Sequence, residues 1–492
     1  MEDEVETKFE VGLIGAGAIA VESHIPVLKG IKNVEVVVMC DSRVDVAKAA
    51  ASKFDVKSVL RLLEITRDLS RDSAAFMVIS NLTSELQRRG HIVKNTTVVL
   101  DLDRSNKISD APCVIPKKFA ASFLGSFFGR FLVDTILYVP LFLRSFKMFK
   151  QEQFDIVISH YHNHHLGSFV AHIVSKLQKK PHVIFVHDLH SFSQTSQRVE
   201  RIYDRLMFSI NTVPLENADK IFVQSQGIKK ELEVSFKVES DKIAVLPNCV
   251  DVDFFLDRSI HESAIVQIRE KYQLAQDKVI LYLGTAYRNS GAELLLEALP
   301  SVLEKGCKTS IMFLGWPHAQ DVLSKIADEL GVSQKVIFAG AVSHDNVPLF
   351  LALADVAVGH LGIVGTKHTI PVKVLEYMAA GKPVVALQYS VTDELLTDGY
   401  NGLLLHKADK DELAELLVRL LQDPSYARNL GLNAQKTVIE NYDVKVVGQR
   451  LETELYNIIP KKKQDEVFQT LLRHGHLLAL SSSCFSLVRK KA

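Results

Sequence analysis

The chain has 492 residues, enough for about three domains, and its 47% hydrophobic and 24% charged residues are those of an ordinary globular protein. The 58 basic and 58 acidic residues balance, so the charge gives no reason to expect a nucleic-acid partner. The five cysteines include no CxxC pair, which argues against a disulfide framework or a zinc cage, and the acidic N-terminus is unlike a secretory signal. We therefore expect a protein of a reducing, cytoplasmic compartment that binds no nucleic acid.

The first residues have the pattern of a partial Rossmann βαβ fragment. Residues 9–16 predict an apolar strand, which leads into the glycine-rich turn Gly15-Ala16-Gly17-Ala18-Ile19-Ala20. A second strand at 34–40 ends in Asp41, where an acidic residue that binds a ribose belongs. If this fragment binds a dinucleotide, Gly15, Gly17 and Asp41 are the cofactor-binding residues.

Residues 10–59 resemble the first third of the NAD(P)-binding domain of the Gfo/Idh/MocA oxidoreductases, including His24-Ile25-Pro26. The later strand of that domain and the family's Glu-Lys-Pro signature, which carries its catalytic lysine, are absent. Two βα units are too few to wrap a dinucleotide. The resemblance therefore favours a remnant or a docking module, and we expect no NAD(P) to be required.

A second α/β segment begins near residue 61. Strands are predicted at 61–66 and 92–100, with a helix at 76–89 between them. The loop at 70–75 contains no glycine, which makes a close approach of its backbone to a phosphate less favourable.

Residues 117–150 combine aromatic and basic side chains. Phenylalanines recur at every fourth position from 119 to 131 and share one helical face, and Pro140 is expected to break this run. The charges sum to 6 − 1 = +5, and no uncharged run reaches the roughly 18 residues of a membrane span. Two interpretations stay open: an interfacial helix pair on an anionic membrane surface, or two amphipathic helices that pack on their own sheet.

Histidines follow two predicted strands. The strand at 154–160 ends in His160, and the strand at 182–186 leads into His187-Asp188-Leu189-His190. Ligands of open α/β sheets bind beyond the carboxyl ends of the strands, so we expect these side chains to line a crevice. A metal site is the alternative, but no carboxylate or cysteine completes a recognisable ligand spacing, and we predict none.

The segment 247–251 reads Pro-Asn-Cys-Val-Asp. The next strand, 279–283, ends at Gly284-Thr285, and a helix follows at 292–304. Further apolar strands predict a second parallel sheet, at 310–314, 336–339 and 356–359.

The stretch from Thr366 to Ala386 carries the most specific pattern. Pro371 suits a helix start, residues 372–380 predict a short helix, and Gly381 suits a left-handed helix end. The first amides of such a helix lack partners within it, so residues 369–372 could hold a pyrophosphate.

Glu376 lies one turn further into this helix, where its carboxylate could accept both hydroxyls of a ribose. An ordinary helix with a surface glutamate is the alternative, because a motif match is only a hypothesis.

The pattern Pro-x-Lys-x-x-Glu-Tyr-Met-Ala-x-Gly-x-Pro-Val over residues 371–384 resembles the donor-sugar motif of retaining GT-B glycosyltransferases of the family 4 / group 1 type. The resemblance covers about 61–460. It includes the segment 247–251, which is similar to the family's Pro-Asn-Gly-Val-Asp with Cys249 in place of glycine, and which is therefore expected to mark the crossing between two domains. It implies an α/β protein with two Rossmann-like parallel-sheet domains that face a cleft. It also implies a donor site, for which the matching positions are Gly284, Thr285, His368, Thr369, Ile370, Pro371, Val372 and Glu376, with His160 and Asp188 lining the same cleft.

The sequence departs from this family's donor-site pattern at three positions. Relatives usually have two cations where this chain has Thr285 and Ser290, and a first glutamate where it has His368. We expect Arg288 and Lys373 to offset the charge of the leaving pyrophosphate instead. The resemblance places His187 where it would position the donor sugar.

The predicted organisation is a partial Rossmann fragment (1–60), a GT-B acceptor domain (61–258), a nucleotide-sugar domain (259–440), a crossover helix (441–460) and a basic and apolar tail (461–492). The apolar part of the tail is too short to span a bilayer and suggests a weak membrane contact or a frayed end.

The predicted function is retaining transfer of a hexosyl unit from a UDP- or GDP-sugar to a glycan or lipid-linked hydroxyl, without a further cofactor and with a possible peripheral membrane contact through 117–150. Two alternatives stay open. One is an impaired pseudo-transferase that binds nucleotide sugars without turnover, and the other is an NAD(P)-linked oxidoreductase.

Overall fold

The structure is a computed structural model, and contacts divide the chain into two units. One unit comprises residues 1–62, 88–92 and 455–492, and the other comprises 63–87 and 93–454. The structure describes residues 9–14, 34–40, 61–67, 74–101, 114–116, 127–151, 154–161, 166–187, 189, 198–256, 262–284, 291–315, 319–362, 368–389, 391–459, 475–479 and 485–490.

The first unit contains a four-stranded sheet that joins the two ends of the chain, in the order β16-β17-β1-β2. β1 (Phe9–Ile14) and β2 (Val34–Cys40) run parallel, as a βαβ fragment requires. The tail was expected to be frayed or to contact a membrane, but it forms β16 (Gly475–Ala479) and β17 (Phe485–Lys490). β17 pairs antiparallel with β1, so it covers the edge at which a dinucleotide fold would add a parallel strand.

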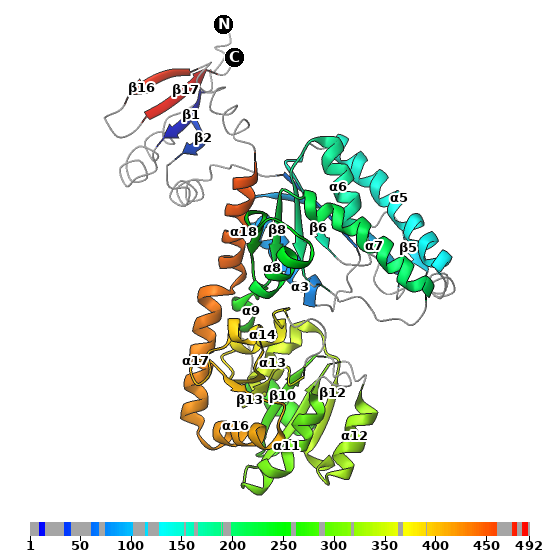
Figure 1. The fold of residues 1–492 in the computed structure, drawn as a ribbon. Coiled ribbons are helices and arrows are strands. Elements are labelled where there is room, and N and C mark those ends of the chain that lie inside the picture. Colours follow the sequence, from blue (N-terminus) through cyan, green and yellow to red (C-terminus); the bar gives the residue numbers. More distant parts are fainter. Residues whose placement is uncertain are drawn as a thin grey trace. The chain divides into compact units, whose positions relative to one another are not determined.

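The second unit begins with a lobe built on a seven-stranded sheet, which we call the N-terminal lobe (Figure 1). The strand order is β5-β4-β3-β6-β7-β8-β9, and β6 to β9 pair in parallel. The strands are β3 (Arg61–Arg67), β4 (Ile92–Asp101), β5 (Val114–Pro116), β6 (Ile156–Tyr161), β7 (His182–Val186), β8 (Lys220–Val223) and β9 (Ile243–Val245). The helices are α3 (Ala74–Arg88), α5 (Phe127–Gln151), α6 (Gly167–Gln178), α7 (Arg198–Asn217) and α8 (Gln226–Ser235). The short helix α9 (Val252–Leu256) follows this lobe and packs in the core of the next one.

The expected break at Pro140 is wrong, because α5 continues through this proline. Tyr138, Leu141 and Phe149 lie on one face and pack in a buried cluster with Phe154 and residues of α6. An internal proline costs about 3 kcal/mol. Burying several large apolar side chains contributes about 1.5–3 kcal/mol each, so packing outweighs the proline.

The other lobe, the C-terminal lobe, contains a six-stranded sheet in the order β12-β11-β10-β13-β14-β15, with every pairing parallel. The strands are β10 (Lys278–Leu283), β11 (Thr309–Leu314), β12 (Val336–Gly340), β13 (Val356–Val358), β14 (Val384–Leu387) and β15 (Leu403–Leu405). The helices are α10 (Glu262–Lys271), α11 (Ala292–Glu304), α12 (Gln320–Glu329), α13 (Val347–Leu353), α14 (Val372–Ala379), α15 (Thr392–Leu395) and α16 (Lys410–Gln422).

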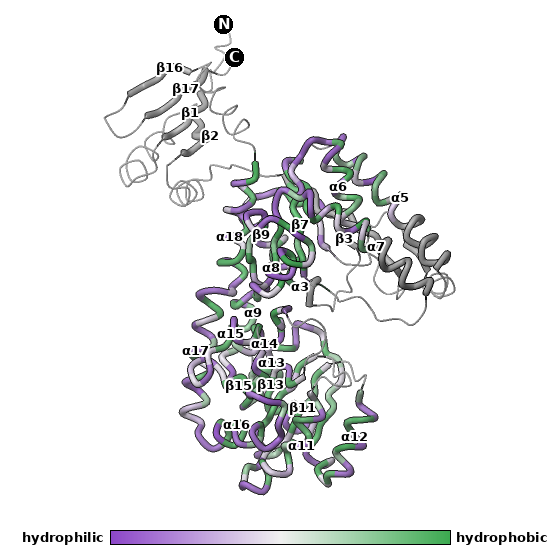
Figure 2. The backbone as a smooth tube through the Cα atoms, viewed as in Figure 1, coloured by the Kyte–Doolittle hydropathy of each residue, from purple (hydrophilic) through white to green (hydrophobic). Residues whose placement is uncertain are grey.

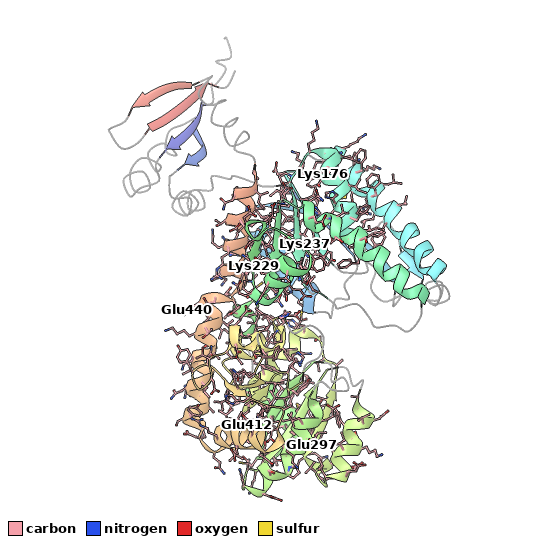
Figure 3. The ribbon with its side chains drawn as sticks, viewed as in Figure 1. Lys176, Lys229, Lys237, Glu297, Glu412 and Glu440 are labelled. Carbon is pink, nitrogen blue, oxygen red and sulfur yellow. The ribbon has the colours of Figure 1, made fainter. Side chains whose placement is uncertain are left out.

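Two parallel sheets with helices on their faces confirm the predicted α/β architecture. Every residue of β7 and β11 is buried, as expected for strands covered on both faces. The apolar run of β7 appears green in Figure 2. Charged side chains lie on outer helices, and Figure 3 labels Lys229 and Glu412 among them. Lys229 pairs with Glu233, and Glu412 with His406, so these charges form ordinary surface pairs.

α17 (Pro424–Asn441) and α18 (Val444–Ile458) return the chain from the C-terminal lobe to the N-terminal lobe (Figure 1). α17 packs on α14. At the turn between the two helices, Asp443 forms a bridge with Val250. On α18, Glu454 pairs with Lys220 of β8, and Gly448 leaves room for the side chain of Glu85 on α3.

Candidate active site

α14 forms as the sequence predicts, and local chemistry explains both of its ends. Pro371 precedes the helix with φ −74°, and Gly381 follows it with φ +67°, the left-handed conformation that glycine adopts without strain. In the described part of the chain, no side chain caps the start of the helix. The first amides of α14 therefore lack a side-chain acceptor, as an anion site at a helix start requires.

Lys373 lies in the first turn of α14 and points toward the end of β10. Its Nζ is buried and has no hydrogen-bond partner among the described residues. It lies 4.1 Å from the ring centroid of Tyr282 and next to Gly284, which has φ +98°. The same ammonium, together with burial, lowers the pKa of His360 to about 3. A buried cation without an acceptor is unfavourable on its own and is well placed to receive an anion.

Glu376 is 4% exposed and binds His344, a residue that the sequence did not single out. His344 Nε2 lies 2.9 Å from Glu376 Oε1. The imidazole also stacks on Phe254, with ring centroids 5.1 Å apart and planes 7° apart. The hydrogen bond to Glu376 raises the pKa of His344. The interpretation of Glu376 as a solvated surface side chain is therefore wrong.

A cavity of about 210 Å³ adjoins Glu376 and His344. α3 of the N-terminal lobe contributes Met77 and Asn81 to its wall, and the crossing segment contributes Cys249. Residues from both lobes therefore enclose a space beside the carboxylate that was predicted to bind a ribose.

The loop 368–370 ahead of α14 is held by the N-terminal lobe through its backbone. Ser225 Oγ donates to the carbonyl of His368 at 2.5 Å, and Asn248 Nδ2 donates to the carbonyl of Ile370 at 2.8 Å. Thr369 Oγ1 in turn donates to the carbonyl of His187 at 3.4 Å. The loop that was predicted to bind a pyrophosphate and the histidine that was predicted to position a sugar are therefore in contact.

His187 follows β7 and is 5% exposed. Its Nε2 lies 2.8 Å from Nδ1 of His160, which belongs to β6. Its Nδ1 lies 3.1 Å from Nε2 of Gln224, which follows β8. Three neighbouring parallel strands therefore bring these side chains together at their carboxyl ends, as the sheet topology predicts.

Several predicted site residues lie outside the described part of the chain. These are Arg288, Thr285, Ser290, Asp188 and the dinucleotide positions Gly15, Gly17 and Asp41. Among the residues that are described, no three potential metal ligands come together.

The sequence missed Gln224, Ser225 and His344 as site residues. Asn248 was part of the crossing motif but had no assigned contact. His344 follows the residues 340–343 of the β12 loop, so its position at a strand end was an available signal. Gln224 likewise follows β8 directly.

Two parts of the chain match models of known protein families. Residues 265–437 match the glycosyl transferases group 1, and residues 75–254 match glycosyltransferase family 4. These matches cover one lobe each. Together with the two parallel-sheet lobes, they define this protein as a glycosyltransferase with the GT-B fold.

Individual relatives and solved structures are similar to this chain over different shares of its length. Alpha-D-kanosaminyltransferase of Streptomyces kanamyceticus is 22% identical over 66% of this chain and 82% of its own length. The GDP-mannose-dependent alpha-(1-6)-phosphatidylinositol monomannoside mannosyltransferase of Mycolicibacterium smegmatis is 27% identical over 42% of this chain and 54% of its own. The crystal structure of HepE from Anabaena with UDP-glucose matches with a TM-score of 0.61 and 18% identity, over 81% of this chain and all of that one.

Proposed function

We propose that the protein transfers a hexosyl unit from a nucleotide diphosphate sugar to a hydroxyl group, with retention at the anomeric carbon. The observation that carries this proposal is the buried ammonium of Lys373, which lies at the start of α14 and has no hydrogen-bond acceptor among the described residues. A diphosphate is the ligand that both features favour. The Anabaena relative that shares the fold was crystallised with UDP-glucose, which is a ligand of this class.

The donor is oriented by groups on both sides of this helix start. The diphosphate lies against the amides of 369–372, and Lys373 offsets the charge of the leaving group. Glu376 binds the ribose from the cavity that it shares with His344. Arg288, in the loop after β10, is the second cation of the proposed site.

The sugar lies toward His187, whose carbonyl contacts Thr369 of the donor loop. In the proposed step, the bond between the anomeric carbon and the phosphate oxygen breaks. The acceptor oxygen bonds to the anomeric carbon from the same face, and the hydroxyl proton passes to the leaving phosphate. This route needs no carboxylate nucleophile from the protein.

We propose further that the acceptor is carried on a lipid or glycan and that α5 contacts the membrane surface. Val139 is 51% and Leu143 is 59% exposed, and Lys147 and Lys150 are exposed further along the same helix. Apolar and basic side chains together suit an anionic lipid surface. In the described part of the chain, no helix is both long and apolar enough to cross a membrane.

Transfer of radiolabel from a panel of UDP- and GDP-sugars to a membrane lipid extract tests the reaction. We expect one donor to label a lipid-soluble product, and Glu376→Ala to remove most of the turnover. Binding of a nucleotide sugar without any transfer across the panel would favour the pseudo-transferase alternative. For the surface of α5, Val139→Ser with Leu143→Ser should weaken binding to vesicles of anionic phospholipid and leave transfer to a soluble acceptor unchanged.

A further inference from the structure

Four buried side chains form a continuous chain of hydrogen bonds from the N-terminal lobe to the donor loop. Nδ1 of His160 faces Nε2 of His187 at 2.8 Å, and Nδ1 of His187 faces Nε2 of Gln224 at 3.1 Å. Oε1 of Gln224 accepts from Asn248 Nδ2 at 3.1 Å, and the same Nδ2 donates to the carbonyl of Ile370 at 2.8 Å. All four side chains are at most 7% exposed.

The donor and acceptor of every hydrogen bond in this series follow from the last bond, which runs from Asn248 to the carbonyl of Ile370. A backbone carbonyl can only accept, so the atom of Asn248 that faces Ile370 must be the amide nitrogen. That nitrogen uses its second hydrogen toward Gln224, which must therefore present its oxygen. The other end of the Gln224 amide is then the NH₂ group, and it donates to Nδ1 of His187.

An imidazole nitrogen that accepts a hydrogen bond carries no proton. The neutral ring of His187 therefore has its proton on Nε2, from which it donates to Nδ1 of His160. A second proton on His187 would lie on Nδ1 and would face the NH₂ group of Gln224. The amide cannot accept that proton, so the bond would be lost.

We propose that Gln224 and Asn248 are positioning residues that hold His187 as the neutral tautomer with its proton on Nε2. This inference rests on the proposed role of His187 beside the donor sugar. His187 is then held as a neutral ring beside the sugar, with its Nε2 proton bound to His160 and its Nδ1 bound to Gln224. That choice matters because positive charge develops on the sugar in glycosyl transfer, and an imidazolium beside it would raise the barrier.

Through these hydrogen bonds, the position of the His187 proton in the N-terminal lobe depends on the donor loop of the C-terminal lobe. The carbonyl of Ile370 belongs to the donor loop, and it fixes which way the Asn248 amide points. With the loop in place, the amide of Gln224 is aligned and the tautomer of His187 is set. The reactive geometry and the proton position are therefore established together.

The ring nitrogens of the full-length protein, labelled with ¹⁵N at histidine, test the assignment directly. We expect the wild-type spectrum to show His187 with an unprotonated Nδ1 and a protonated Nε2, the signals being assigned by their loss in His187→Asn. A protonated Nδ1 in the wild type overturns the proposal. This measurement needs no turnover, so its outcome is independent of whether a donor has been found.

Gln224→Glu tests the mechanism, because it keeps the shape and replaces the NH₂ group by an acceptor. Asn248 can still donate to one carboxylate oxygen, so we expect a melting temperature near that of the wild type. We expect the proton to appear on Nδ1 of His187 and kcat to fall at least tenfold, about the worth of one charge-assisted hydrogen bond. Gln267→Glu makes the same substitution at an exposed position of α10 and should leave both quantities unchanged.

Each result of this comparison decides one half of the proposal. If Nδ1 stays unprotonated in Gln224→Glu, Gln224 does not set the tautomer. If Nδ1 becomes protonated while kcat stays within twofold of the wild type, the tautomer has no role in transfer. Wild-type protein that shows the expected tautomer but no transfer from any donor would instead refute the proposed function.

Discussion

Lys373→Met is the most informative single substitution in the donor site. Methionine keeps the length of the buried stem and removes only the ammonium group, which has no hydrogen-bond acceptor among the described residues. The structure predicts opposite effects on stability and on activity. A trade-off between stability and activity is expected where a binding site contains a buried charge that is unfavourable until the ligand binds.

The magnitudes follow from the contacts of the ammonium. Removing an unsatisfied buried donor raises the free energy of unfolding by about 1–3 kcal/mol, and by more for a charged group. Losing the contact with the ring of Tyr282 lowers the free energy of unfolding by about 0.5–2 kcal/mol. We expect net stabilisation of about 1 kcal/mol, or about 1 °C in the melting temperature of a unit of this size. Loss of a charge-assisted bond to a diphosphate, about 1.5–3 kcal/mol, should weaken UDP or GDP binding by roughly 10- to 100-fold.

Thermal melts of both proteins with and without UDP and GDP measure the two effects together. Lys382→Met is the matched control, because this buried lysine donates to the carbonyls of Ala352 and Ala354. It should lower the melting temperature and leave nucleotide affinity unchanged. A loss of stability in Lys373→Met comparable with that of the control, or unchanged nucleotide affinity, would refute the reasoning.

The remaining predictions concern groups around the donor loop. Because Glu376 raises the pKa of His344, this pair stabilises the fold fully below the ordinary histidine pKa and less as the pH rises through the raised value. His344→Gln should therefore lower the melting temperature more at pH 6 than at pH 9, and an equal loss at both would contradict this. In Gly227→Ala, the new Cβ would lie 2.3 Å from Nδ1 of His368, so we expect a loss of about 1–3 kcal/mol and a higher KM for the donor. In Gly167→Ala, the new Cβ would have no described atom within 4 Å, so this variant should keep the wild-type stability and the wild-type KM. Equal behaviour of the two variants would argue against the close packing at His368.

Features that depend on near neighbours in the chain were predictable from the sequence. α14 ends where Gly381 follows its apolar run, and β2 runs from Val34 to Cys40 as expected. The order of strands and helices also sufficed for the α/β class, because parallel strands need crossover connections.

Features that depend on distant packing were not predictable. Pro140 lies within α5 because the buried face around Leu141 and Phe149 compensates for it, and a helical pattern alone does not show that compensation. The strands of the C-terminal tail find their partner at β1, nearly the whole chain away. The partner of Glu376 on the β12 loop was missed for the same reason, since His344 lies 32 residues earlier and only the fold brings it close.

The departure from the family motif at residue 368 leaves the backbone of the donor loop held in place. The resemblance implies a glutamate at this position, in contact with the donor sugar, where this chain has His368. In this structure, the N-terminal lobe binds the backbone carbonyls of His368 and Ile370, which any residue supplies. The side chain of His368 fits against Gly227, where there is no Cβ to exclude it. The position of the loop therefore depends on Ser225 and Asn248, whose side chains donate to these carbonyls.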